Sequence, residues 1–155
     1  DLPMLALSLY VLWRWWPRGR APGLLAVLFI GLLWWPVTFA LFSLQSLLYM
    51  GSGEFLLGRA PAHALFIGLF GSLVVAMVSR VTQGHSGRPL KMYGLAWFAF
   101  VGIQFVAAMR IAAEVMPDVL LWQALSALGW LLVLSPWGMR IGGIYLSPRV
   151  DGKPG

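Results

Sequence analysis

The chain has 155 residues, of which 60% are hydrophobic and only 10% are charged, and its formal net charge is +6. A soluble domain carries roughly 25% charged residues, so this composition excludes a water-soluble globule and indicates a surface that faces lipid. The sequence contains no cysteine, which excludes disulfides, iron–sulfur ligation and covalent haem attachment through a C-x-x-C-H motif.

Uncharged runs divide the chain, and four of the five are long enough for a helix of about 20 residues to cross a bilayer core of about 30 Å. They cover residues 2–13, 21–53, 60–79, 92–109 and 119–139. The sequence therefore predicts an all-α, polytopic transmembrane helical bundle with four full helices plus the end of a fifth. We expect one transmembrane domain over residues 1–155.

The first run is too short to cross a bilayer alone. Residues 2–16 also lack the basic start and the small-residue cleavage site of a signal peptide. The chain opens at Asp1 rather than at a methionine. We therefore expect this run to be the last turns of a helix whose beginning is missing, and the chain to be the carboxy-terminal part of a larger membrane protein.

The second helix is expected to contain a kink. A helix over residues 23–50 would be about 42 Å long, which exceeds the bilayer core and predicts a tilt or a bend. Pro36 follows Trp34 and Trp35 in its middle. Because proline removes a backbone donor, the bend is predicted there.

The third helix carries small residues at every fourth position, at Ala64, Gly68, Ser72 and Ala76. This ridge favours close packing against another helix, although a flat wall for a planar macrocycle is the alternative. Pro61 suits the first turn of this helix, and Gly84 is predicted to end it.

The two histidines lie at opposite ends of this third helix. His63 and His85 are 22 residues apart, or about 33 Å of helix, so they cannot bind one metal ion within a single copy of the chain. His63 is predicted to share the outer membrane face with Met50, Glu54 and Glu114. Histidine with methionine suits copper or axial haem ligation, and an interfacial histidine among lipid-facing methionines is the alternative.

His85 lies in a basic segment with Arg80, Arg88 and Lys91. With glycines on both sides of the histidine, the segment could bind an anion, either haem propionates or an anionic lipid, with the two arginines as donors and His85 as a possible ligand. A solvated cytoplasmic loop is the alternative.

The basic residues predict the orientation of the helices. Lys and Arg are frequent in the first connection, the third connection and the tail, and scarce in the second and fourth connections. In the tail they are Arg140, Arg149 and Lys153. The positive-inside rule therefore places the carboxy terminus in the cytoplasm. This topology explains the +6 charge, and no nucleic-acid module, nucleophile–base–acid triad or phosphate loop is present. A transporter half is less favoured, because no acidic residue lies within the membrane.

Two segments resemble the NnrS family of bacterial membrane proteins. They are HALFIGLFGSLVVAMVSRVTQGHSGRPL, residues 63–90, and PRVDGKPG, residues 148–155, in the same order as in the family. The resemblance implies the last third of a protein of about twelve helices in the bacterial inner membrane. It also implies non-covalent haem, copper, and a role in nitric oxide metabolism or nitrosative-stress tolerance.

This resemblance makes His63, Arg80, His85 and Arg88 the predicted cofactor-binding residues. The predicted metal ligands are His63, His85 and Met50, and whether the protein is an enzyme stays open. The expected partners are the lipid bilayer and either the remaining helices of the same protein or partner membrane subunits. The alternative function is that of a structural or assembly subunit packed against a larger respiratory or photosynthetic complex.

Overall fold

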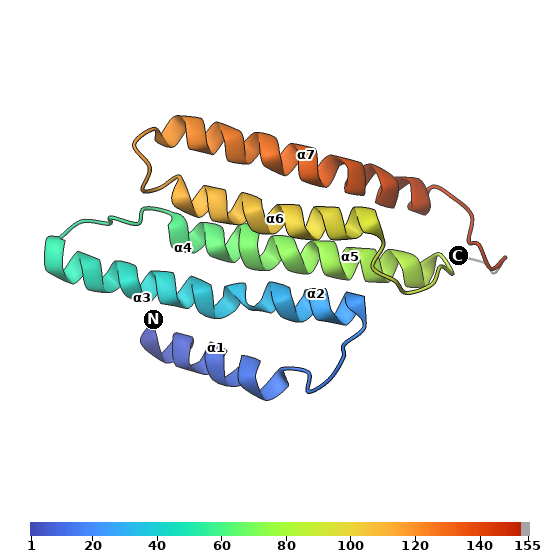
Figure 1. Cartoon of the computed structure of the whole chain (residues 1–155), viewed down its shortest axis with the longest axis horizontal. Helices are drawn as coiled ribbons and strands as arrows, with labels where there is room; N and C mark the ends of the chain where they lie inside the picture. Colours follow the sequence, from blue (N-terminus) through green and yellow to red (C-terminus); the bar gives the residue numbers. More distant parts are fainter. Residues whose placement is uncertain (153–155) are drawn as a thin grey trace.

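A computed structural model describes residues 1–152, and every regular element within that range is a helix. Figure 1 shows the helices lying roughly parallel to one another. In chain order they are α1 (Leu2–Trp15), α2 (Gly23–Leu32), α3 (Trp34–Ser52), α4 (Ala60–His63), the π-helix η1 (Ala64–Gly71), α5 (Ser72–His85), α6 (Gly94–Ala112) and α7 (Val119–Tyr145).

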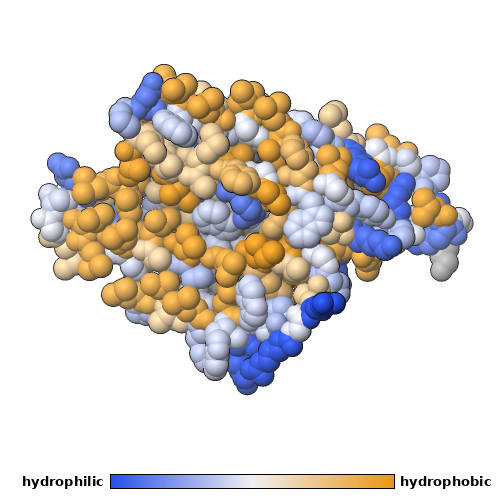
Figure 2. Space-filling model, viewed as in Figure 1, coloured by the Kyte–Doolittle hydropathy of each residue, from blue (hydrophilic) through white to orange (hydrophobic). Residues whose placement is uncertain are grey.

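These helices form four spans that are long and apolar enough to cross a membrane, and α1 is a shorter apolar helix. The spans cover Gly23–Ser52, Ala60–His85, Gly94–Ala112 and Val119–Tyr145. Figure 2 shows apolar residues over most of the visible face, with strongly hydrophilic residues gathered beside the carboxy terminus and at the lower edge. The predicted all-α bundle with four full spans is confirmed, and its surface fits a lipid bilayer.

The core lies among the three central spans and the inner side of α7. Figure 1 shows the span that ends in α5 next to α6, with α2 and α3 on one side and α7 on the other. The fully or almost fully buried residues that pack together there are Val27, Val75, Ala76, Ala96, Ala99, Phe100 and Trp137. Three of the seven are alanines, which let the helix backbones approach closely at those positions.

The second span is interrupted, as the Trp34–Trp35–Pro36 stretch predicts, but the break lies three residues before the proline. Helix α2 ends at Leu32, Leu33 adopts a turn, and α3 begins at Trp34. The Leu33 amide donates to the Ile30 carbonyl at 3.1 Å, an i to i−3 bond in place of the usual i to i−4 bond. Pro36 lies in the first turn of α3 and has no backbone N–H with which to donate an i to i−4 hydrogen bond.

The small-residue ridge of the third span is buried, which supports the close-packing interpretation over a macrocycle wall. Gly68 faces the indole ring of Trp34, and a methyl group at Gly31 would lie 2.8 Å from the Ser72 Cβ. The Trp34 indole N–H donates to the Gln104 side-chain oxygen at 2.5 Å, and the Gln104 amide donates to the Ser72 hydroxyl at 2.8 Å. Glycine and serine therefore let three spans share one buried polar network.

The end of α5 differs from the prediction. The helix continues past Gly84 to His85, and Gly87 takes the left-handed conformation with φ +72°. The Arg88 amide donates to the Gln83 carbonyl at 2.9 Å, and the Gly87 amide donates to the Gly84 carbonyl at 3.4 Å. This pair of bonds is a Schellman cap, so the capping glycine was misplaced by three residues in the prediction.

The structure brings the basic connections to one end of the bundle. Residues 16–22, 86–93 and 146–152 share that end, and residues 53–59 and 113–118 share the other (Figure 1). Lys153 lies outside the described residues. The cytoplasmic orientation of the basic end stays a prediction from the positive-inside rule.

Single cysteines in this cysteine-free chain test the orientation. Lys91→Cys at the basic end should react with a membrane-impermeant maleimide only after the membrane is opened, and Val115→Cys should react from outside. Both side chains are exposed, whereas Ser86 is only 7% exposed and would label poorly at either face. Labelling of Lys91→Cys from outside, with protection of Val115→Cys, would invert the topology.

Candidate functional site

The histidines lie at the two ends of one continuous helical span, as their spacing predicts. His63 closes the first turn at Ala60, and His85 is the last helical residue. Pro61 lies in the first turn, where its missing amide costs no hydrogen bond, so that prediction is also confirmed. Each histidine therefore belongs to a separate site.

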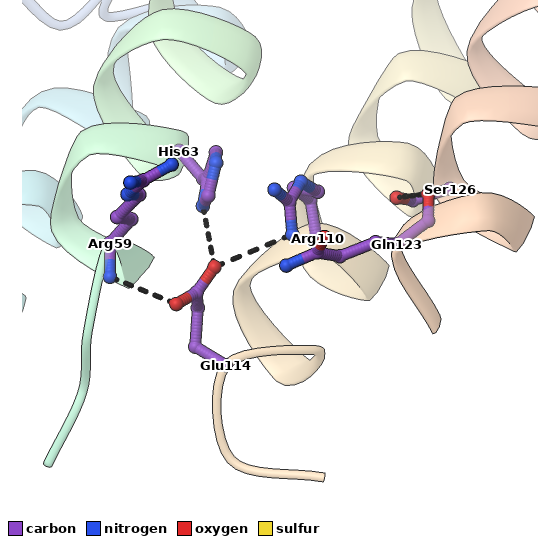
Figure 3. Close-up of polar contacts among 6 residues, drawn as sticks. All are labelled: Arg59, His63, Arg110, Glu114, Gln123 and Ser126. Atoms are coloured by element: carbon purple, nitrogen blue, oxygen red, sulfur yellow. Dashed lines mark hydrogen bonds and ion pairs between the residues drawn. The ribbon is translucent and has the colours of Figure 1, made fainter. Parts of the chain in front are cut away.

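At the end of the bundle opposite the basic connections, which is the predicted outer end, Glu114 connects the residues around His63. Its Oε1 lies 3.6 Å from the His63 Nδ1 and 3.4 Å from the Arg110 Nη1, and its Oε2 accepts a hydrogen bond from the Arg59 amide at 3.1 Å. Figure 3 shows the carboxylate between α4 and α6, with these groups converging on it. We call Arg59, His63, Arg110 and Glu114 the Glu114 cluster.

The local backbone explains how the Glu114 cluster forms. Glu114 follows the carboxy-terminal cap of α6 and lies one helical turn beyond Arg110, a spacing that favours an ion pair. Gly58 has φ +49°, and the Glu114 carboxylate lies where a side chain at this position would be. A glycine at position 58 therefore lets the connection carry the Arg59 amide to Glu114.

The His63 imidazole has an unpaired nitrogen close to a carboxylate. Its Nδ1 is buried without a hydrogen bond, and a Glu114 carboxylate oxygen lies 3.6 Å from it. A carboxylate beside one imidazole nitrogen directs the other nitrogen toward a ligand and raises its basicity. The Glu114 cluster can therefore present His63 as a single metal ligand with a fixed ring orientation.

The other residues predicted near His63 are exposed, and the role predicted for Met50 as a metal ligand stays a prediction. Met50 is 82% exposed and Glu54 is also exposed, both in the outer part of the α3–α4 region. Within residues 1–152, three His, Cys, Asp or Glu side chains are not gathered around any one point. A copper ion at His63 would need ligands from outside this set.

A large cavity of about 650 Å³ lies beside the Glu114 cluster, between η1, α6 and α7. Its polar groups are Arg110, Gln123 and Ser126, two of which lie on α7 across from Arg110 in Figure 3. The rest of its lining is Ile67, Val106, Leu120, Ala124, Ala127, Trp130 and Leu131. An apolar cavity with a few polar groups at one end is typical of a site for an amphipathic molecule.

At the basic end, His85 is exposed beside a separate pocket of about 350 Å³, the His85 pocket. The lining comes from the end of α5, the end of α7 and the tail: Thr82, His85, Ser86, Ile144, Tyr145, Ser147, Pro148 and Arg149. The Val150 amide donates to the Ser86 carbonyl at 3.1 Å, so the tail closes this pocket. The two segments that resemble the NnrS family therefore contact each other.

The two predicted arginine donors do not share the His85 pocket. Arg80 is exposed within α5, and Arg88 lines a different, smaller cavity with Arg140. Arg149, which was not among the predicted site residues, is the arginine beside His85. It also donates two hydrogen bonds to Asp151, at 2.9 and 2.6 Å. The roles predicted for Arg80, His85 and Arg88 toward a cofactor stay predictions.

Sequence reasoning placed Glu114 at the same end of the bundle as His63, as the structure has it, but did not identify it as the partner of His63. The sequence did indicate that Glu114 could form an ion pair, because it lies four residues after Arg110 in a connection with few charges. Arg140 and Arg149 gave no such indication for the pockets that they line, because those pockets are shared with residues from helices distant in sequence.

Comparison with known proteins gives one family. A family model described as NnrS protein matches residues 1–149, which is nearly the whole chain. No curated protein and no solved structure matches the chain.

Proposed function

The chain belongs to the NnrS family, and from that premise we propose that it is a haem- and copper-binding protein of the bacterial inner membrane that serves nitric oxide metabolism or nitrosative-stress tolerance. The observation that carries this proposal is the family match over residues 1–149. Haem iron and copper, when bound, supply the redox and ligand-binding chemistry that nitric oxide requires.

The chemistry of the outer end fits copper. Imidazole is a ligand that copper favours, and the buried His63 Nδ1 beside Glu114 leaves Nε2 as the nitrogen to bind metal. Glu114 would hold the ring and Arg110 would hold Glu114. The remaining copper ligands would come from other helices of the protein or from partner subunits.

The chemistry of the basic end fits haem. A single histidine suffices as an axial ligand, and His85 lies exposed on a pocket that also contains Arg149. A guanidinium group can bind the carboxylate of a propionate through charge-assisted hydrogen bonds. His85 would therefore bind the iron, and Arg149 would hold one of the propionates through the guanidinium N–H groups that do not bind Asp151.

Growth under nitric oxide stress tests this function. In a bacterial strain that lacks its own copy, the intact protein should restore growth in the presence of a nitric oxide donor, and the empty vector should not. If the protein gives no protection and its loss instead prevents assembly of a respiratory complex, the alternative function as a packing subunit would replace this proposal.

A further inference from the structure

A small cavity lies between the end of α5, the start of α6 and the last turns of α7, with a volume of about 20 Å³. We call it the arginine cavity, and it is lined by Ser79, Gln83, Arg88, Tyr93, Ala96, Trp137, Arg140, Ile141 and Ile144. This volume holds a guest of about the size of one water molecule or one oxygen atom. The lining includes two arginines and no carboxylate.

The Arg88 guanidinium group lacks a hydrogen-bond acceptor in this cavity. Its Nη1 is buried and has no hydrogen-bond partner. The Schellman cap holds the Arg88 backbone in place, since its amide donates to the Gln83 carbonyl at 2.9 Å. A buried guanidinium N–H without an acceptor is costly, more so than a neutral donor. The site therefore favours an anionic guest.

Arg140 brings a second positive charge to the same cavity from α7. Its guanidinium carbon lies 5.5 Å from the centre of the Tyr93 ring, a cation–π contact that positions the group without neutralising it. The side chain is exposed, so a guest can reach it from the membrane surface. The two guanidinium groups can therefore act on one anion.

Among residues 1–152, no carboxylate lines the arginine cavity. Of the five acidic residues of the chain, only Asp151 lies at this end, and Arg149 binds it at 2.6 Å. Of the other four, Glu54, Glu114 and Asp118 lie in the connections at the opposite end of the bundle, and the Asp1 carboxylate accepts a hydrogen bond from Ser46 of α3. The anion must therefore come from outside the described residues.

We propose that Arg88 and Arg140 bind a phosphate oxygen of an anionic phospholipid headgroup at the cytoplasmic membrane surface. Basic pockets between transmembrane helices on this side commonly take such headgroups. Trp137, Ile141 and Ile144 form the apolar wall of the cavity on the inner side of α7, while little of the α7 span as a whole is buried. The acyl chains would run along the exposed outer side of α7, next to the exposed Arg140. The proposal does not depend on bound haem or copper.

Lipid binding by the intact purified protein tests the proposal. Phosphatidylglycerol and phosphatidylcholine would be titrated separately, and bound lipid counted by native mass spectrometry. The unsubstituted protein should prefer phosphatidylglycerol. Arg140→Gln should weaken that binding by about tenfold or more, the scale of a lost charge-assisted hydrogen bond. Arg80→Gln is the matched control, because Arg80 is an exposed arginine of α5 outside the lining of the arginine cavity.

Equal losses in Arg140→Gln and Arg80→Gln would overturn the proposal, since they would show a general effect of surface charge. Unchanged affinity in Arg140→Gln would overturn it too. Inorganic phosphate separates the two sources of the oxyanion: if it binds as tightly as the lipid and displaces it, the lipid assignment is wrong. Arg140→Gln is chosen over a change at Arg88 because Arg140 is exposed and the protein should fold without it.

Discussion

Replacing His63 by alanine should abolish copper binding by the intact protein, and replacing Glu114 by glutamine should weaken it roughly 10- to 100-fold. His63 supplies the ligand nitrogen in our proposal, whereas Glu114 supplies its orientation. Glutamine can still accept the hydrogen bond from the Arg59 amide, but it loses the negative charge that faces His63 and Arg110. Glu114 is therefore a positioning residue rather than a ligand.

A chelator competition measures the copper affinity, and electron paramagnetic resonance of Cu(II) reports the ligand nitrogen. Glu54→Gln is the matched control, because it makes the same change in an exposed glutamate of the outer α3–α4 connection. Only variants that elute as a single species would be compared. Equal affinity in Glu114→Gln and Glu54→Gln would contradict the role of Glu114, and retained copper in His63→Ala would contradict that of His63.

Replacing His85 by alanine should change or abolish the visible spectrum of bound haem, because the iron would lose its axial nitrogen. The side chain is exposed at the His85 pocket, so the substitution removes little packing and the fold should persist. Arg149→Ala should lower haem retention with a smaller spectral change, since it touches the propionate and not the iron.

Lys91→Ala is the control for both changes at the His85 pocket. Lys91 is an exposed cation at the same end, and the bond that it makes to the Gln83 side chain at 2.8 Å comes from its backbone amide, which alanine keeps. Its variant should keep the spectrum and the haem content. A spectrum that survives intact in well-folded His85→Ala would remove His85 as the ligand.

The spans could be predicted from sequence because each depends on a local property, whereas two helix ends were predicted only to within three residues. A run such as 119–139 is apolar over the thickness of a bilayer, and that alone predicts a spanning helix. The break near Pro36 was predicted because proline lacks a donor, although its position moved to Leu33. Gly84 and Gly87 both suit a helix end, and the sequence alone does not distinguish them; in the structure Gly87 takes the left-handed conformation and the tail contacts the cap at Ser86.

The site could be predicted only in part because its partners come from distant positions. His63 and Glu114 are 51 residues apart, and their contact depends on α4 packing against α6. Arg88 was predicted to bind an anion together with Arg80, which is close to it in sequence. Helix packing instead places Arg88 in one cavity with Arg140. The π-helix from Ala64 to Gly71 also gave no sequence signal, since its apolar residues suit an α-helix equally well.

The visible spectrum and the iron and copper contents of the intact, unsubstituted protein, purified from membranes, test the central claim most directly. Our account predicts bound haem and bound copper in stoichiometric amounts, and a change in the haem spectrum when nitric oxide is added to the reduced protein. A well-folded preparation that contains neither haem nor copper would contradict it and would favour a role in packing or assembly of a larger membrane complex.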